Sequence, residues 1–87
     1  MIIELDGRLM TDRATAHTYL KAKLSLPEHY GRNLDALFDL LTEMPGSVTI
    51  TILHMEAFVD NLGSYGSSLL KTFRDAAEKN PALTIHI

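Results

Sequence analysis

The segment "SVTITIL", Ser47–Leu53, is the clearest strand signal in the chain and decides the fold class. Apolar side chains alternate with small polar ones at every second position, which is the period of a strand with one buried face. The apolar set is Val48, Ile50 and Ile52. Because this strand lies near the middle of an 87-residue chain, we expect the segments on both sides to pack around it.

Two further strands are expected near the two ends of the chain. Ile2–Leu5 precedes the turn signal Asp6-Gly7, and Leu83–Ile87 alternates again after a proline. Long segments with helical spacing separate neighbouring strands, so right-handed parallel crossovers are the simplest connections. The sequence therefore predicts an α/β fold, a small three-stranded parallel sheet with four helices packed on it.

The four helices are expected in the two connections, where apolar residues recur at helical spacing. The segment "GSYGSS", Gly63–Ser68, is interpreted as a turn and helix entry, with the cap of the last helix at or near Ser67. The expected helices are one capped by Thr11 or Asp12 and ending at Leu24, one capped by Asn33 and ending at Glu43, Met55–Leu62, and one from about Ser67 to Lys79.

Length and composition set the class of protein. A chain of 87 residues with 46% hydrophobic and 22% charged residues is typical of one small globular domain, here spanning residues 1–87. The absence of cysteine excludes disulfides and thiolate metal sites. The first residues, "MIIELDGR", lack a signal-peptide pattern, and no apolar run approaches the ~18 residues of a membrane span. We expect a soluble, cytoplasmic monomer that does not bind membranes.

The charges are distributed unevenly. The net charge is −3, but the segment from Asn33 to Leu70 holds five acids and no base, so it carries −5 and the rest of the chain carries +2. Such a segment argues against direct nucleic-acid binding and for a cationic partner. A plain solvated surface explains it equally well at this stage. The five acids are Asp35, Asp39, Glu43, Glu56 and Asp60.

The second expected helix has two different faces. At about 100° per residue, its leucines gather on one side and predict the side that packs on the core. Phe38 and Thr42 lie with Asp35 and Asp39 on the opposite, outward face. An exposed aromatic beside carboxylates is typical of an interface anchor, so the face is either a protein-binding surface or a solvated one. The core leucines and methionine are Leu34, Leu37, Leu40, Leu41 and Met44.

The residues just before this helix offer a second feature. Gly31 suits a turn with positive φ or a backbone that a partner approaches closely. His29 and Tyr30 are candidates for the edge of the outward face, although Tyr30 could equally pack on the core with Gly31 only making the turn. Both interpretations of Tyr30 and Gly31 stay open on the sequence.

Catalytic and metal chemistry find little support. Asp35 and Asp39 form a possible acid–base pair, but nothing in the sequence desolvates one of them to separate their pKa values. The four histidines are scattered and none is at metal-ligand spacing. His17 is expected to be a packed, hydrogen-bonded histidine. We therefore expect no enzyme activity, no metal and no cofactor.

The stretch "LSLPEHYGRNLDALFDLLT", Leu24–Thr42, resembles the barstar family of intracellular ribonuclease inhibitors through its pattern L-P-x-x-Y-G-x-N-L-D-A-L-x-D. The resemblance covers nearly the whole chain, including a first helix with His17, the run "FRDA" at Phe73–Ala76 and the closing "ALTIHI" at Ala82–Ile87. It implies the barstar-like fold. It also implies a protein that binds and blocks a small basic microbial ribonuclease of the barnase type.

The resemblance also implies binding residues. Asp39 matches the family's acid that occupies the ribonuclease's phosphate site, and Asp35 matches one that pairs at the rim of that site. Asp75 stands in the last helix where the family has a glutamate. His29 and Phe38 replace a tyrosine and a tryptophan of the best-known member, and Arg32 replaces an acid. The implied partner-binding set is His29, Gly31, Asp35, Phe38, Asp39, Thr42 and Asp75.

Three functional hypotheses follow. The first is an inhibitor that occludes a ribonuclease active site with the outward face. The second is a non-inhibitory binding or regulatory module of the same fold for another basic protein, which loss of RNA cleavage at near-equimolar ratio would distinguish from the first. The third is an enzyme with carboxylate chemistry, which requires a cleft around Asp35 and Asp39.

Overall fold

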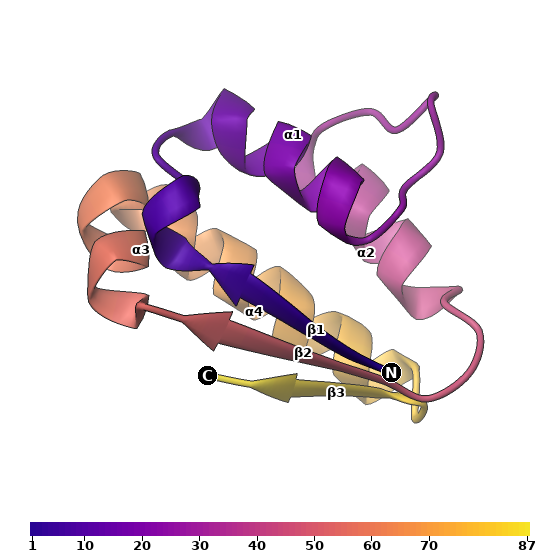
Figure 1. Cartoon of the computed structure of the whole chain (residues 1–87). Helices are drawn as coiled ribbons and strands as arrows, with labels where there is room; N and C mark the ends of the chain where they lie inside the picture. Colours follow the sequence, from indigo (N-terminus) through magenta and orange to yellow (C-terminus); the bar gives the residue numbers. More distant parts are fainter.

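The computed structural model describes residues 1–87 and contains four α-helices and three strands. Figure 1 shows the path of the chain from the N-terminus, at the start of β1, to the C-terminus after β3. This is the α/β architecture that the sequence predicts. In chain order the elements are β1 (Ile2–Asp6), a short 3-10 turn η1 (Gly7–Leu9), α1 (Arg13–Lys23), α2 (Leu34–Thr42), β2 (Val48–Leu53), α3 (Met55–Leu62), α4 (Ser64–Lys79) and β3 (Leu83–His86).

The sheet has the order β1-β2-β3, and both strand pairs are parallel. Both crossovers step in the same direction across the sheet, so right-handed connections place both helical segments on the same face. Figure 1 shows α4 behind the strands and no helix crossing in front of them. Along β2, Val48, Ile50 and Ile52 are buried, whereas the alternating residues are half-exposed. The alternation of "VTITIL" thus marks the helix-covered face.

The predicted caps of the first two helices are confirmed. The Asp12 carboxylate accepts a hydrogen bond from the Thr15 backbone N–H at 2.8 Å, and the Asn33 side-chain oxygen accepts one from Ala36 at 2.8 Å. In each case a side chain satisfies one of the amides that a helix start leaves unpaired. The Asn33 cap fixes where the α1–α2 loop, residues 24–33, ends and α2 begins.

The predicted start of the last helix is wrong. α4 begins at Ser64, so Ser64–Ser68 already form its first turns, and no side chain near Ser67 caps it. The break between α3 and α4 is the single residue Gly63, with a φ of 55°. Gly66 lies inside α4 and is buried, and an added Cβ there would come within 3.2 Å of both Leu62 and Phe58. Glycine lowers helix propensity at this position but lets α3 and α4 pack closely.

The core lies between the sheet and the helices. Phe58 and Phe73 are its largest fully buried side chains, and Leu37 and Leu41 bring α2 onto it. α2 also packs along α4. None of the helices combines the length and the apolar character that crossing a bilayer requires.

Candidate functional site

The two faces of α2 are separated by burial. Leu37 and Leu41 are completely buried, whereas Asp35 and Asp39 are exposed. At about 100° per residue, Asp39 points about 180° away from the midpoint of the two leucines. Asp35 lies in the first turn, where a negative charge interacts favourably with the helix dipole. The expected division of the helix into a core side and an outward acidic side is confirmed.

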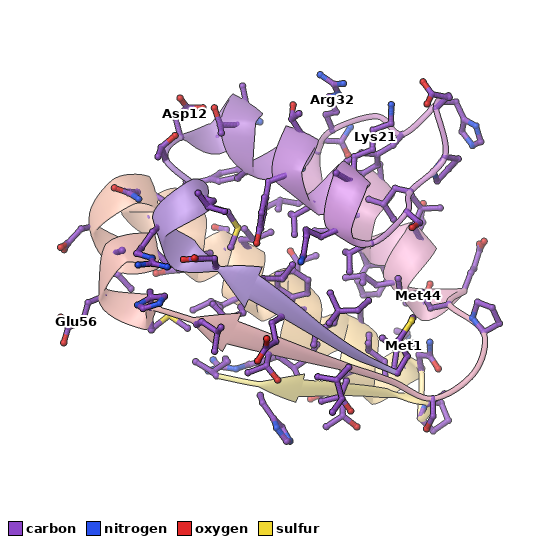
Figure 2. All side chains as sticks on the ribbon, viewed as in Figure 1. Met1, Asp12, Lys21, Arg32, Met44 and Glu56 are labelled. Atoms are coloured by element: carbon purple, nitrogen blue, oxygen red, sulfur yellow. The ribbon has the colours of Figure 1, made fainter.

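The outward carboxylates have no cationic partner within the chain. The ion pairs of the structure are Arg8–Asp6, Lys21–Glu28 and Lys71–Asp75, and neither Asp35 nor Asp39 belongs to one. The nearest base in the sequence, Arg32, extends away from the body of the molecule in Figure 2. The two carboxylates of α2 are therefore free to meet a cation supplied by another molecule.

The outward face differs from the sequence expectation at its edge. Phe38 is half-buried and packs against the core, so the expectation that it forms an exposed aromatic anchor is wrong. Its position, about 60° from the buried Leu41 around the helix, brings it to the edge of the core side of α2. Thr42 is also half-buried, and its hydroxyl donates to the Asp39 carbonyl oxygen at 2.8 Å. The fully exposed part of this side of the helix consists of carboxylates.

The loop and the helix together form an open pocket of about 220 Å³. It brings together three residues of the predicted set, His29, Gly31 and Asp39, from two segments of the chain. It also includes Glu43, which the sequence reasoning did not select. The signal was available, because Glu43 follows Asp39 by four residues and so lies one turn further along the same face. We call the exposed carboxylates Asp35, Asp39 and Glu43 the acidic face. The remaining lining residues are Tyr30, Ala36 and Leu40.

Gly31 has a different role from the positive-φ turn considered on the sequence. The left-handed residue of this loop end is Arg32, with a φ of 53°, and Gly31 is not left-handed. A Cβ on Gly31 would lie 3.1 Å from the Asn33 side-chain nitrogen and 3.4 Å from the Ala36 Cβ. The same Asn33 nitrogen donates to the Gly31 carbonyl oxygen at 3.2 Å. Glycine thus keeps the loop backbone close to the start of α2.

Asp75 stands apart from this pocket, on α4. Its carboxylate accepts a hydrogen bond from Lys71 at 2.7 Å, and its side chain is 45% exposed. The bond to Asp75 raises the pKa of Lys71. Asp75 is accessible, as expected, but unlike the acidic face it already has a cation beside it.

The expectation that His17 is a packed, hydrogen-bonded histidine is confirmed. Its Nδ1 lies 2.6 Å from the Tyr30 hydroxyl and its Nε2 is hydrogen-bonded to the Tyr65 hydroxyl. Burial, reinforced by the charges of Arg13 and Arg32, lowers the pKa of His17. Burial also raises the pKa of Tyr30 to about 12. Of the two interpretations of Tyr30, the core-packed one holds, since its side chain is buried behind the pocket.

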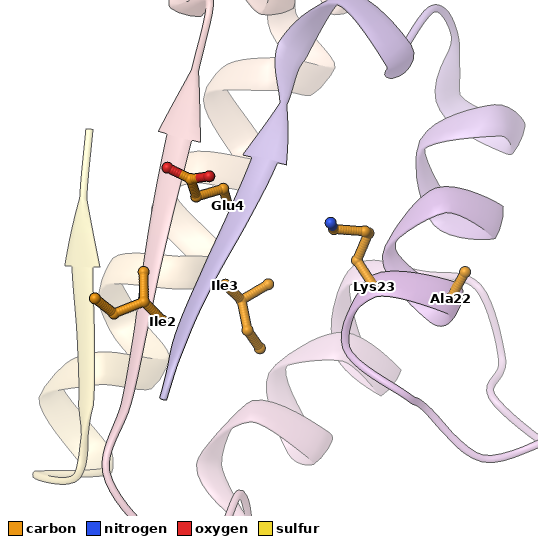
Figure 3. Close-up of a pocket in the computed structure, with 5 residues that line it drawn as sticks. All are labelled: Ile2, Ile3, Glu4, Ala22 and Lys23. Atoms are coloured by element: carbon orange, nitrogen blue, oxygen red, sulfur yellow. The ribbon is translucent and has the colours of Figure 1, made fainter.

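The largest concavity of the molecule lies elsewhere. It measures about 610 Å³ and lies between the outer edge of β1 and the end of α1 (Figure 3). It shares no residue with the acidic face and offers only one acid and one base, so we do not assign the site there. Its lining residues are Ile2, Ile3, Glu4, Ala22 and Lys23.

Comparison with known proteins identifies the family of this chain. The family described as Barstar (barnase inhibitor) matches residues 1–86. A Bacillus subtilis (strain 168) protein named "Putative ribonuclease inhibitor YrdF" is 39% identical to this chain over 80 residues, which cover 88% of this chain and 86% of that protein. Because the family match extends over nearly every residue, the chain belongs to the barstar family.

Proposed function

We propose that this chain is a ribonuclease inhibitor that binds a small, basic, barnase-like microbial ribonuclease and occludes its active site with the acidic face of α2. The observation that carries the proposal is the exposure of Asp35 and Asp39 and their lack of an ion-pair partner within the chain. Both carboxylates are exposed and unpaired on a helix whose opposite side carries the completely buried Leu37 and Leu41. Membership of the barstar family supports the same class of partner.

The mechanism needs no chemical step. A ribonuclease must hold the phosphates of RNA, so its active-site cleft is lined with cations. In the proposed complex the Asp39 carboxylate takes the place of a phosphate, and Asp35 pairs with cations at the rim of the cleft. Opposite charges steer the two proteins together, with an association rate towards about 10⁸ M⁻¹s⁻¹ at low salt. Substrate is then excluded by the volume of the helix and loop.

The remaining predicted residues extend the contact on both sides of α2. His29 and Gly31 contribute from the α1–α2 loop, because they line the pocket that contains Asp39. Phe38, Thr42 and Asp75 contribute on the α4 side. An interface of about 800 Å² per partner is typical of stable complexes, and the acidic face alone is too small to supply it. Both flanks are therefore part of the proposed footprint.

We further propose that the chain acts as a single domain over residues 1–87, as a cytoplasmic monomer without metal or cofactor. Its partner is the ribonuclease itself and not RNA. An enzyme with carboxylate chemistry is disfavoured, because Asp35 and Asp39 are exposed to water and no enclosed cleft surrounds them.

The test compares Asp39→Ala with Glu56→Ala. Glu56 is also an exposed, unpaired acid on a helix, but it lies on α3, at the opposite end of the molecule from Met44 at the end of α2 (Figure 2). The unmodified chain should abolish RNA cleavage by a barnase-like ribonuclease at a near-equimolar ratio. Removing a buried interfacial charge costs several kcal/mol, so Asp39→Ala should weaken binding by about 30-fold or more and Glu56→Ala by less than about 2-fold.

Each other outcome has a distinct meaning. Equal effects of the two substitutions in a calorimetric titration would contradict the assignment of the acidic face. Binding to the ribonuclease without loss of RNA cleavage would instead support the non-inhibitory module of the same fold. Absence of any binding to barnase-like ribonucleases would overturn the proposed partner.

A further inference from the structure

A hydrogen-bonded chain of three side chains, two of them buried, begins at Tyr30, which lines the pocket of the acidic face. His17, on α1, is hydrogen-bonded through Nδ1 to the Tyr30 hydroxyl of the α1–α2 loop and through Nε2 to the Tyr65 hydroxyl of α4. His17 is 1% exposed and Tyr30 is 6% exposed. The chain therefore joins three segments that are separated in the sequence by 13 and 48 residues.

The hydrogen-bonding capacity of His17 is completely used in this arrangement. A neutral imidazole has one N–H donor and one acceptor nitrogen, so one tyrosine hydroxyl donates to it and the other accepts from it. The tyrosine rings also pack against the imidazole, with centroids 5.8 Å and 5.9 Å away. Removing either hydroxyl leaves a nitrogen without its partner in a buried place, which is costly.

Tyr30 is the internal anchor of the α1–α2 loop. It is the only buried residue between Leu24 and Leu37, and it stands between His29 and Gly31, both of which line the pocket with Asp39. The loop's other side-chain links to helices are the Asn33 cap at its end, at 2.8 Å from the Ala36 nitrogen, and the surface pair Lys21–Glu28, at 3.2 Å. Surface pairs of this kind hold a loop weakly. The position of the loop side of the pocket therefore depends on the bond between Tyr30 and His17.

We propose that His17 is a positioning residue for the partner-binding surface. It does not contact the partner. It holds Tyr30, so that His29 and Gly31 already lie beside Asp39 in the free protein. The proposal rests on the proposed function for its binding consequence, whereas its structural part concerns the free protein alone. A loop that is ordered in advance loses less conformational entropy on binding, and so binds more tightly.

The test uses two variants that break the link from either end, His17→Leu and Tyr30→Phe. The second keeps the aromatic ring and removes only the hydroxyl. Tyr30→Phe should weaken binding to a barnase-like ribonuclease by about 10-fold, the size expected for one lost buried hydrogen bond, and His17→Leu, which removes the bonds to both tyrosines, by at least as much. The loss should appear mainly as faster dissociation, because the charges that steer association are unchanged. Restoring a polar group with His17→Gln should recover part of the affinity.

A control separates positioning from general loss of stability. Phe58→Leu reduces packing in the core on α3, outside the pocket of the acidic face, and should leave the affinity unchanged at a temperature where every variant is folded. An equal loss of affinity in Phe58→Leu would overturn the proposal. Wild-type affinity in both His17→Leu and Tyr30→Phe would overturn it as well. If His17→Leu does not fold, Tyr30→Phe alone decides.

Hydrogen exchange in the free protein gives a measurement that does not depend on the partner. The Tyr30 N–H donates to the Pro27 carbonyl oxygen at 2.9 Å, so its exchange rate reports opening of the loop. Exchange of this amide should be about 10-fold faster in His17→Leu than in Phe58→Leu. Unchanged exchange would overturn the proposal. If the wild-type chain binds no ribonuclease, the proposed function fails, and the exchange rates still decide whether His17 positions the loop.

Discussion

The side-chain amide of Asn80 donates a hydrogen bond to the backbone carbonyl oxygen of Leu41 at 3.0 Å. The same nitrogen lies 3.2 Å from the Met44 carbonyl oxygen, and the Asn80 side-chain oxygen accepts from Ala82 at 3.1 Å. Asn80, at the end of α4, thereby donates to one carbonyl group of α2 and to one just beyond it, and the Leu41 oxygen also accepts the long bond from the Met44 N–H at 3.4 Å. A residue 39 positions away thus closes the helix that carries the acidic face.

Asn80→Ala is therefore expected to lower the free energy of unfolding by about 2–3 kcal/mol, since it removes both of these donated hydrogen bonds and leaves the Leu41 oxygen with the long bond from Met44. Asn61→Ala is the matched control. It removes an amide whose hydrogen bond to the Gly7 carbonyl oxygen is long, at 3.4 Å, on an exposed residue, and should cost less than about 0.5 kcal/mol. Urea unfolding followed by circular dichroism measures both. Equal losses would contradict the role of Asn80.

Gly7→Ala is expected to destabilise the fold for a steric reason. An added Cβ would lie 2.5 Å from the His54 carbonyl oxygen and 2.8 Å from the Phe58 Cβ, and backbone atoms cannot rotate away. Overpacking of this kind costs about 3 kcal/mol. Gly46→Ala is the control that introduces backbone strain without a steric clash, because Gly46 has a φ of 75° with open space around it. It should lower the free energy of unfolding by about 1 kcal/mol. Thermal unfolding should rank Gly7→Ala as the more damaging change.

Lys71→Ala should speed association with a basic ribonuclease while leaving stability almost unchanged. The Lys71–Asp75 pair is exposed, so its loss should change the free energy of unfolding by less than about 0.5 kcal/mol. Removing the cation leaves Asp75 free to attract the partner, and we expect an association rate about 3-fold higher at low salt. Lys23→Ala, which makes the same change in net charge at the end of α1 (Figure 3), should have a smaller effect. Stopped-flow mixing at two salt concentrations tests this, and a gain that persists at high salt would argue against it.

The stability of the protein should fall as the pH is lowered from about 6.5. The folded-state pKa of His17 is below its ordinary value of 6.5, so the unfolded chain binds the proton more readily in this range. The stabilisation is complete above the unfolded pKa and is lost as the pH falls through the folded pKa. Urea midpoints between about pH 7.5 and pH 5 should show this slope. His17→Gln should flatten it, whereas His86→Gln, at an exposed position, should retain it.

Local features of the fold follow from the sequence. The caps Asp12 and Asn33 act within three residues of themselves, and their hydrogen bonds are found where the capping pattern predicts them. The alternation of β2 and the leucine side of α2 depend only on the geometry of a strand or helix. The start of α4 was missed because glycines and serines favour loops locally, whereas close packing of Gly66 against α3 favours a helix there.

The sequence by itself determined the class of fold, the two faces of α2 and the excess of acids in the middle of the chain. These depend on the order of residues and on local geometry. Tertiary structure alone decided that Phe38 is half-buried and that Asn80 and His17 hold α2 and its loop in place. Burial and buried hydrogen bonds depend on which distant segments meet. The periodicity of one segment contains no information about its neighbours across the core.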